Sequence, residues 1–275
     1  MLSDILTQVA IVVGLMVVLS TAVFIGRDRL EQTQREWLSR VRVSAPVLAV
    51  LACVLVFNRI MRDNQPDIGV YMTRTIRSIE GEFVLIFQAI ASEDVTLYFS
   101  FTYIYGYAFL LIFPPIAYFA LSNTRPFRRL LTAYSLNYAI GVVIYALVIA
   151  YGPRNFMPEL PTILYNVNPE AQHLTREVNR NTNVFPSLHT SLSATVAMFA
   201  YQTRSEYPNW FPVSVVFAVS VIISTMYLGI HWGIDVIGGL ILAVVCVVAS
   251  DRIVGRWSVT TLYETFRERL SSHVE

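Results

Sequence analysis

The chain has 275 residues, of which 55% are hydrophobic and 14% are charged, and its net charge is +1. A net charge this close to zero gives no indication of a nucleic-acid partner, and we expect none. The apolar residues form long blocks with the charges between them, which is typical of an integral membrane protein. All of the basic residues are arginine, so any mechanism that needs a lysine is excluded.

Seven apolar blocks approach the roughly 20 residues that a helix needs to cross a bilayer. The first block is too long for a signal peptide and lacks the basic start and the cleavage site, so we expect a retained span. The sequence therefore predicts an all-α, polytopic transmembrane helix bundle of about seven spans. The expected spans are 5–26, 44–62, 96–121, 131–151, 186–203, 211–230 and 232–250.

We expect the chain to form one bundle, because no Ser/Gly-rich linker and no fixed-period repeat divides it. We expect an N-terminal span with its cytoplasmic loop at 1–43, a membrane core at 44–251 and a cytoplasmic tail at 252–275. Cys53 and Cys246 lie in different apolar blocks, far apart in the sequence. Their spacing excludes a metal motif and a disulfide framework.

The arginines indicate how the spans are oriented. Thirteen lie in the loops after the first, third and fifth spans and in the C-terminal tail, whereas six lie in the connections on the opposite side. The positive-inside rule then places the C-terminus in the cytoplasm and the N-terminus outside. Two segments on the outer side do not span. Residues 66–93 read as an interfacial helix, and residues 152–185 form a long, proline-containing loop.

The most informative residues are His231 and Asp235, which lie four positions apart in an apolar stretch. Ionisable side chains in such a place are costly and usually functional. On a helix this spacing puts both on one face, where the carboxylate can orient the imidazole. A second histidine, His189, stands at the start of another apolar block. The predicted topology places both histidines on the extracytoplasmic side.

Two histidines, one of them backed by a carboxylate, suit transfer of a phosphoryl group through a covalent phosphohistidine. We expect His231 to be the nucleophile and His189 the general acid. Ser187 and the backbone amides at the start of the fifth span are expected to hold phosphate oxygens. The alternatives are polar packing residues or a shared zinc ion. Zinc is disfavoured because no third strong ligand stands near, and we expect neither a metal nor a cofactor.

These residues carry a family resemblance. Pro186-Ser187-x-His189, followed after a further span by His231-x-x-x-Asp235, resembles the motifs of the membrane type 2 phosphatidic acid phosphatase (PAP2) superfamily, which also contains vanadium haloperoxidases. The resemblance covers roughly residues 130–250 and implies a six-helix phosphatase-like core, here preceded by one N-terminal span. Leu188 and Thr225, where the common phosphatase form has glycine and arginine, look most like the inositol phosphorylceramide synthase branch.

The phosphatase branch also has a Lys-x6-Arg-Pro motif that binds phosphate, and this chain departs from it. Its only Arg-Pro pair is Arg125-Pro126, which lies on the predicted cytoplasmic side with Tyr118 at the lysine position. We interpret this pair as part of a basic cluster that sets the topology. The phosphate-binding cations should then come from the outer loop, with Arg154 as the first candidate and Arg180 as the second. For each, the alternative is a solvated loop arginine.

One polar residue inside a predicted span completes the set of candidates. Asn137 is a weaker candidate for phosphate binding, and its alternative role is to bridge helices. Together the residues predict a lipid phosphoesterase that acts on a lipid phosphate at the outer membrane face. Water as acceptor would make it a phosphatase, and a lipid or alcohol hydroxyl would make it a head-group phosphotransferase. No oligomeric state follows from the sequence.

Two alternative functions are also compatible with the sequence. A lipid or ion transporter could use the intramembrane His and Asp as a proton relay, but it would distribute polar residues along several spans, whereas here they cluster at one face. A catalytically inactive, lipid-binding member of the superfamily would explain the missing lysine. The retention of His189, His231 and Asp235 argues against it.

Overall fold

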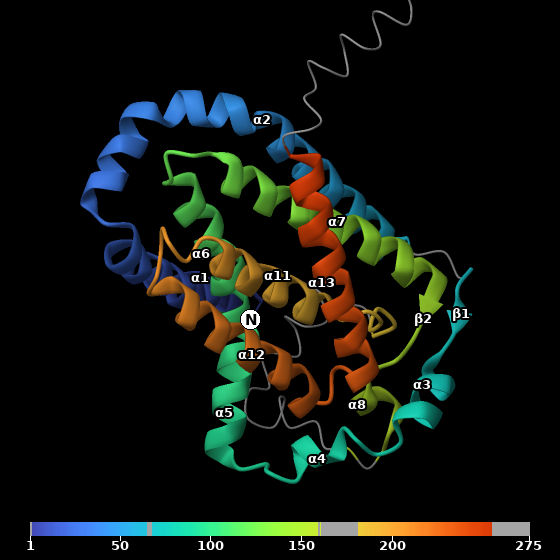
Figure 1. The fold of residues 1–275 in the computed structure, drawn as a ribbon. Coiled ribbons are helices and arrows are strands. Elements are labelled where there is room, and N and C mark those ends of the chain that lie inside the picture. Colours follow the sequence, from blue (N-terminus) through green and yellow to red (C-terminus); the bar gives the residue numbers. More distant parts are fainter. Residues whose placement is uncertain (1, 65–67, 159, 161–180, 255–275) are drawn as a thin grey trace, which may run out of the picture.

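The computed structural model describes residues 2–64, 68–158, 160 and 181–254. These residues are almost entirely helical, which confirms the prediction of an all-α chain. Figure 1 shows the helices gathered around α11. The elements in chain order are α1 (Leu2–Ser20), the π-helical turn η1 (Thr21–Ile25), α2 (Arg27–Asp63), β1 (Val70–Tyr71), α3 (Thr73–Glu80), α4 (Leu85–Gln88), α5 (Glu93–Phe101), the π-helical turn η2 (Thr102–Gly106), α6 (Tyr107–Phe119), α7 (Arg125–Leu147), β2 (Val148–Ile149), α8 (Pro153–Phe156), α11 (Leu188–Gln202), α12 (Trp210–Tyr227) and α13 (Gly233–Ile253).

Within the described part of the chain, 6 helices are long and apolar enough to cross a membrane, which confirms the polytopic bundle. The block at 186–203, expected to be a further span, forms the 15-residue helix α11. Such a helix is about 22 Å long, which is shorter than the roughly 30 Å hydrocarbon core of a bilayer. Ser187 caps its start and Thr203 folds back on Phe199 at its end, and these two contacts limit its length.

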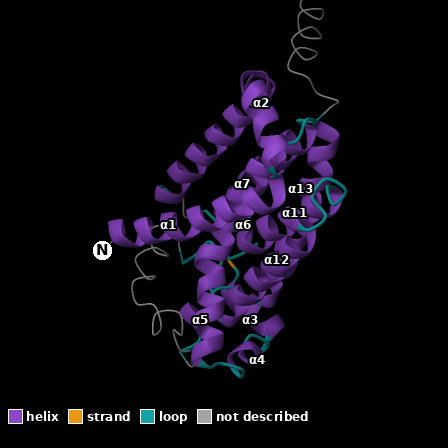
Figure 2. Cartoon of the chain, turned by 90° about the vertical axis from the view of Figure 1, so that its left-hand side faces the viewer, coloured by secondary structure: helices purple, strands orange, loops and turns teal. Residues whose placement is uncertain are grey.

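Helix α2 corrects the expected loop within 1–43. It is one continuous helix of 37 residues that begins at Arg27. Its first part is charged, but the charges pair one turn apart, with Arg27 2.8 Å from Glu31 and Arg40 2.9 Å from Glu36. Pairs at this spacing stabilise a helix by about 0.2–0.5 kcal/mol each. Figure 1 shows α2 arching around the other helices, and Figure 2 shows α1 extending away from them.

One end of the bundle, which we call the Arg129 end, is held by arginines. The Arg40 side chain is 2% exposed and donates hydrogen bonds to the carbonyl oxygens of Phe119, at 2.6 Å, and Leu121, at 2.7 Å. Helix ends leave such carbonyls without helical partners, so Arg40 caps α6 and fastens it to α2. Arg125 and Arg129 lie 3.1 and 3.2 Å from Asp251 and join the start of α7 to the end of α13.

The main hydrophobic core lies between α6, α7, α11 and α12. Its largest buried rings include Phe113 and Trp210, whose centroids are 4.7 Å apart. Helix α11 packs against α6, α7, α12 and α13, so most of its side chains are buried inside the protein. A helix so enclosed does not need to reach across a membrane by itself, which explains how α11 can be short.

The opposite end, which we call the His231 end, carries the connections that fold over the bundle. The sequence predicts one interfacial helix at 66–93, whereas the described residues of this segment form β1, the short helices α3 and α4, and the start of α5. The strand β1 pairs in parallel with β2, with Val70 opposite Val148. A second hydrophobic cluster, centred on the fully buried Trp232, lies beneath these segments. Figure 1 shows α3, α4 and α8 around the N-terminal end of α13.

Candidate active site

The loop between α12 and α13 holds His231 in a fixed position. Gly229 has a φ of 64°, a conformation that glycine adopts without strain, and it reverses the chain after α12. The backbone amides of Ile230 and His231 then both donate to the carbonyl oxygen of Thr225, at 2.9 and 3.1 Å. Thr225 therefore contributes through its backbone, at the position where the phosphatase form has arginine.

Asp235 lies beside His231 and is buried with it. The distance from Nδ1 of His231 to Oδ2 of Asp235 is 3.5 Å, and the two side chains are 4% and 0% exposed. Oδ2 also accepts a 2.7 Å hydrogen bond from the backbone amide of Trp232. The two residues do not share a helical face as expected, because α13 begins only at Gly233. They meet because the loop bends His231 back over the first turn of α13.

His189 joins this pair from α11. Its ring centroid is 5.8 Å from that of His231. The same ring is flanked by Tyr103, at 4.8 Å, and by Tyr107, at 4.5 Å. The structure therefore brings His189, His231 and Asp235 to one place, although His189 and His231 come from different elements.

Close packing between α13 and the start of α11 makes this meeting possible. A Cβ on Gly239 would lie 2.5 Å from the carbonyl oxygen of Ser187, so a larger residue there would force the helices apart. The Ser187 amide donates a 3.0 Å hydrogen bond to the carbonyl oxygen of Asp235. This bond fixes the start of α11, and with it His189, against the first turn of α13.

Burial sets the charge of the His231 imidazole. It lowers the pKa of His231 to about 3, an effect that the nearby Arg154 guanidinium strengthens and a backbone contact with Val184 opposes. Desolvation disfavours the charged form of a base. His231 is therefore neutral at physiological pH and keeps a nitrogen lone pair, as a nucleophile requires.

The structure gives two of the expected phosphate-binding residues a role within the fold. Ser187 is fully buried, and its Oγ accepts a 3.2 Å hydrogen bond from the Thr190 amide as the cap of α11. Both amide protons of Asn137 are engaged, because its Nδ2 donates to the carbonyl of Ala133 at 2.8 Å and to Thr195 Oγ1 at 3.3 Å. Asn137 thus bridges α7 and α11, as its alternative role predicts, and has no donor left for phosphate.

The first arginine candidate lies against the His231 loop. The backbone amide of Arg154 donates a 2.9 Å hydrogen bond to the carbonyl oxygen of Gly229. Gly152 permits this approach, since a Cβ there would lie 2.2 Å from the carbonyl oxygen of Ile230. The backbone contact places Arg154 against the His231 loop, and its positive charge contributes to the lowered pKa of His231. Arg180 lies outside the described residues.

Several residues at the site had no recognisable signal in the sequence. Tyr103 and Tyr107 are four positions apart in an apolar block, a spacing that is also usual for core residues. Glu80 and Gln88, from α3 and α4, contact the two helices that flank the His231 loop. They are about 150 residues away in the chain, so only the fold reveals the contact.

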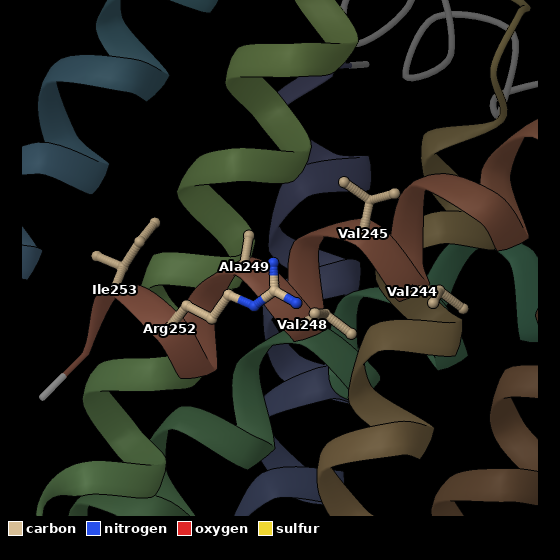
Figure 3. A pocket seen from close by; sticks show the side chains of 6 residues that line it. All are labelled: Val244, Val245, Val248, Ala249, Arg252 and Ile253. Carbon is tan, nitrogen blue, oxygen red and sulfur yellow. The ribbon is translucent and has the colours of Figure 1, made fainter. Parts of the chain in front are cut away.

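Other features of the structure do not mark a site of this kind. Among the described residues, no group of three or more His, Cys, Asp or Glu side chains could hold a metal ion. Figure 3 shows an open surface pocket at the Arg129 end of α13, where the Arg252 side chain reaches towards Val248. It contains none of the candidate catalytic residues. Its lining residues are Val244, Val245, Val248, Ala249, Arg252 and Ile253.

Comparison with known proteins gives one match. A family model described as the PAP2 superfamily matches residues 73–249, which is more than half of the chain. The matched region begins at the start of α3 and includes His189, His231 and Asp235. Neither the curated proteins nor the solved structures gave a match.

Proposed function

Because the chain belongs to the PAP2 superfamily, we propose that it is an integral-membrane lipid phosphoesterase that works through a phosphohistidine on His231. The observation that carries the proposal is the pair of histidine rings 5.8 Å apart, one of them 3.5 Å from a buried carboxylate. One phosphate group can contact both rings at this separation. The neutral His231 imidazole also keeps the lone pair that attack on phosphorus needs.

The reaction has two balanced steps. In the first, a lone pair of the His231 imidazole forms a bond to phosphorus while the bond from phosphorus to the leaving oxygen breaks. His189, which takes up a proton together with the anionic phosphate, gives that proton to the leaving oxygen. In the second, His189 takes a proton from water or an alcohol, whose oxygen attacks phosphorus and breaks the P–N bond. Asp235 orients His231 throughout and stabilises the positive charge that develops on it.

The arginine beside the loop fits the remaining requirement, which is charge stabilisation at the phosphate. Arg154 would stabilise the negative charge that spreads over the phosphate oxygens in the transition state. Arg125, which lies at the other end of the bundle with Asp251, is not placed for this task. The motif resemblance at Leu188 and Thr225 favours an alcohol acceptor, so a head-group phosphotransferase like inositol phosphorylceramide synthase is the finer form of the proposal.

The distribution of arginines and the family match also support an orientation of the chain in the membrane and bounds for its core. We propose that the His231 end and the N-terminus face away from the cytoplasm and that the C-terminus is cytoplasmic, following the distribution of arginines. We also propose that the phosphatase-like core occupies 44–251, with 1–43 and 252–275 as additions. The family match from residue 73 onwards supports the greater part of that core.

Product analysis tests the function. Purified protein in lipid vesicles is given lipid phosphates, with and without lipids that carry free hydroxyls, and the products are identified by mass spectrometry. We expect cleavage that orthovanadate inhibits, since five-coordinate vanadate on a histidine mimics the transition state, and we expect none with His231→Ala. Movement of intact lipid across the vesicle, unaffected by vanadate and without cleavage, would favour the transporter instead.

A further inference from the structure

The segment from Thr73 to Gln88, which contains α3 and α4 and which we call the strap, contacts the polypeptide on both sides of His231. It lies at the His231 end, and Figure 1 shows it around the start of α13. No catalytic motif falls within it. Its contacts nevertheless reach the backbone groups that set the position of the His231 loop.

The first contact is made by Glu80. Its Oε2 accepts a 3.0 Å hydrogen bond from the backbone amide of Ile234, in the first turn of α13. Amides in the first turn of a helix have no helical partner, and a carboxylate there is also favoured by the helix dipole. Asp235 satisfies the Trp232 amide of the same turn, so two carboxylates together cap the start of α13. Phe83 of the strap packs against Gly233, where a Cβ would lie 3.0 Å from its ring.

The second contact is made by Gln88. Its side-chain amide donates a hydrogen bond to the carbonyl oxygen of Tyr227, the last residue of α12. The same nitrogen lies 3.8 Å from the place that a Cβ on Gly229 would occupy. Carbonyls in the last turn of a helix also lack helical partners. Gln88 therefore fixes the end of α12, as Glu80 fixes the start of α13.

We propose that Glu80 and Gln88 are positioning residues that clamp the His231 loop from both sides and so set the geometry of His231 relative to Asp235. The reason is that Ile234 and Asp235 are adjacent in one helical turn, whereas His231 lies in the loop before it. A shift of the α13 start moves the carboxylate against the imidazole. Misplacement by about 1 Å can cost roughly 10²-fold in rate. The catalytic part of this inference rests on the proposed function, but the clamp itself does not.

The test compares Glu80→Ala and Gln88→Ala with Glu80→Gln and with a matched control, Glu82→Ala. Glu82 follows α3 on the same strap, but its side chain is 74% exposed and lies 3.6 Å from Arg77. Hydrogen–deuterium exchange is measured on peptides that contain Ile234, and kcat and KM are measured on the lipid phosphate that the wild type cleaves. The glutamine variant keeps an oxygen that can accept from Ile234 and loses only the charge.

We expect Glu80→Ala to speed exchange at Ile234 at least about tenfold and to lower kcat about 10- to 100-fold, with KM nearly unchanged. Gln88→Ala should lower kcat in the same way. Glu80→Gln should restore most of both, and Glu82→Ala should resemble the wild type. A merely structural role would not give this selective loss of kcat and its rescue.

Three results would overturn the proposal. Unchanged exchange in Glu80→Ala would show that no clamp exists. Faster exchange with an unchanged kcat would show that the clamp does not position the catalytic residues. Equal losses in Glu80→Gln and Glu80→Ala would assign the effect to charge rather than to the hydrogen bond. If the wild type cleaves no lipid phosphate, the proposed function is wrong, and the exchange measurement alone decides whether the strap holds the loop.

Discussion

The two ends of the bundle use their polar side chains in different ways. At the Arg129 end, Arg40 bonds to two backbone carbonyls, and Arg125 and Arg129 share Asp251. At the His231 end, Nδ1 of His231 and Oδ1 of Asp235 are buried and have no hydrogen-bond partner among the described residues. The first arrangement joins helices, whereas the second holds an imidazole and a carboxylate beside each other, 3.5 Å apart, without a full set of hydrogen bonds.

This difference has an energetic meaning. A buried polar atom without a partner costs about 1–3 kcal/mol, so folded proteins keep few of them. The Arg129 end has such atoms too, Nε of Arg128 and of Arg129, so the two ends differ in the kind of group involved, which at the His231 end is an imidazole and a carboxylate that can take part in chemistry. We therefore expect substitutions at the His231 end to lower activity more than stability. Substitutions at the Arg129 end should lower stability more than activity.

Asp235→Asn should have the largest effect. Asparagine keeps an oxygen for the Trp232 amide but loses the charge that orients His231 and stabilises its cationic state. Loss of the orienting carboxylate costs about 10⁴-fold in a hydrolytic triad, and here we expect roughly 10²- to 10³-fold in kcat. Steady-state kinetics and a melting curve measure it. An unchanged kcat in the folded variant would show that Asp235 only caps the start of α13.

Arg154→Ala should have a smaller effect, about 10- to 100-fold in kcat/KM, because one of the groups that stabilise the phosphate charge is lost. Arg125→Ala is the matched control at the other end, and it should change kcat/KM less than threefold or so, as expected of an exposed ion pair. Both are measured on the same lipid phosphate. If Arg125→Ala were the more damaging change, the assignment of the catalytic end would be wrong.

Arg40→Ala should leave turnover nearly unchanged and lower stability instead. It removes the donor to the carbonyls of Phe119 and Leu121, and an unsatisfied buried group costs about 1–3 kcal/mol. For a chain of this size, that corresponds to a fall of several degrees in Tm. Arg42→Ala, at an exposed position of the same helix, is the control. A loss of turnover in Arg40→Ala without a loss of stability would contradict the division between the two ends.

The sequence predicted the helical class and most of the spans, because both depend on local composition. It also predicted that His189, His231 and Asp235 come together, as their positions in the structure show. It did not predict the first part of α2, since hydropathy does not detect a charged helix held by pairs such as Arg27 and Glu31. It left Asn137 between phosphate binding and a bridge between helices, because the partners that occupy its amide, such as Thr195, come from a distant helix.

The contacts that surround the site could not be predicted from the sequence, for a related reason. Glu80 and Ile234 are far apart in the chain, and the sequence around each is ordinary for an interfacial segment and a span. Tyr103, at η2, and Tyr107, at the start of α6, flank His189 because α6 packs against α11. Pairing across the fold is set by the packing of whole helices, which no local pattern in this sequence encodes.

The bridge between α7 and α11 fixes how deep the reaction lies. The Asn137 side chain accepts a hydrogen bond from Ser191, so His189, two residues earlier, lies near the level of the middle of α7. Leu188 packs at Gly141, so His189 lies between the levels of Asn137 and Gly141, and α7 rises roughly 9–15 Å from there to Leu147. In the proposed mechanism, a phosphate must therefore pass below the end of α7 to meet His189. A molecule with long hydrocarbon chains already lies among such helices, whereas a water-soluble phosphoester would lose its hydration without that compensation. The depth of His189 alone thus favours lipids over soluble substrates.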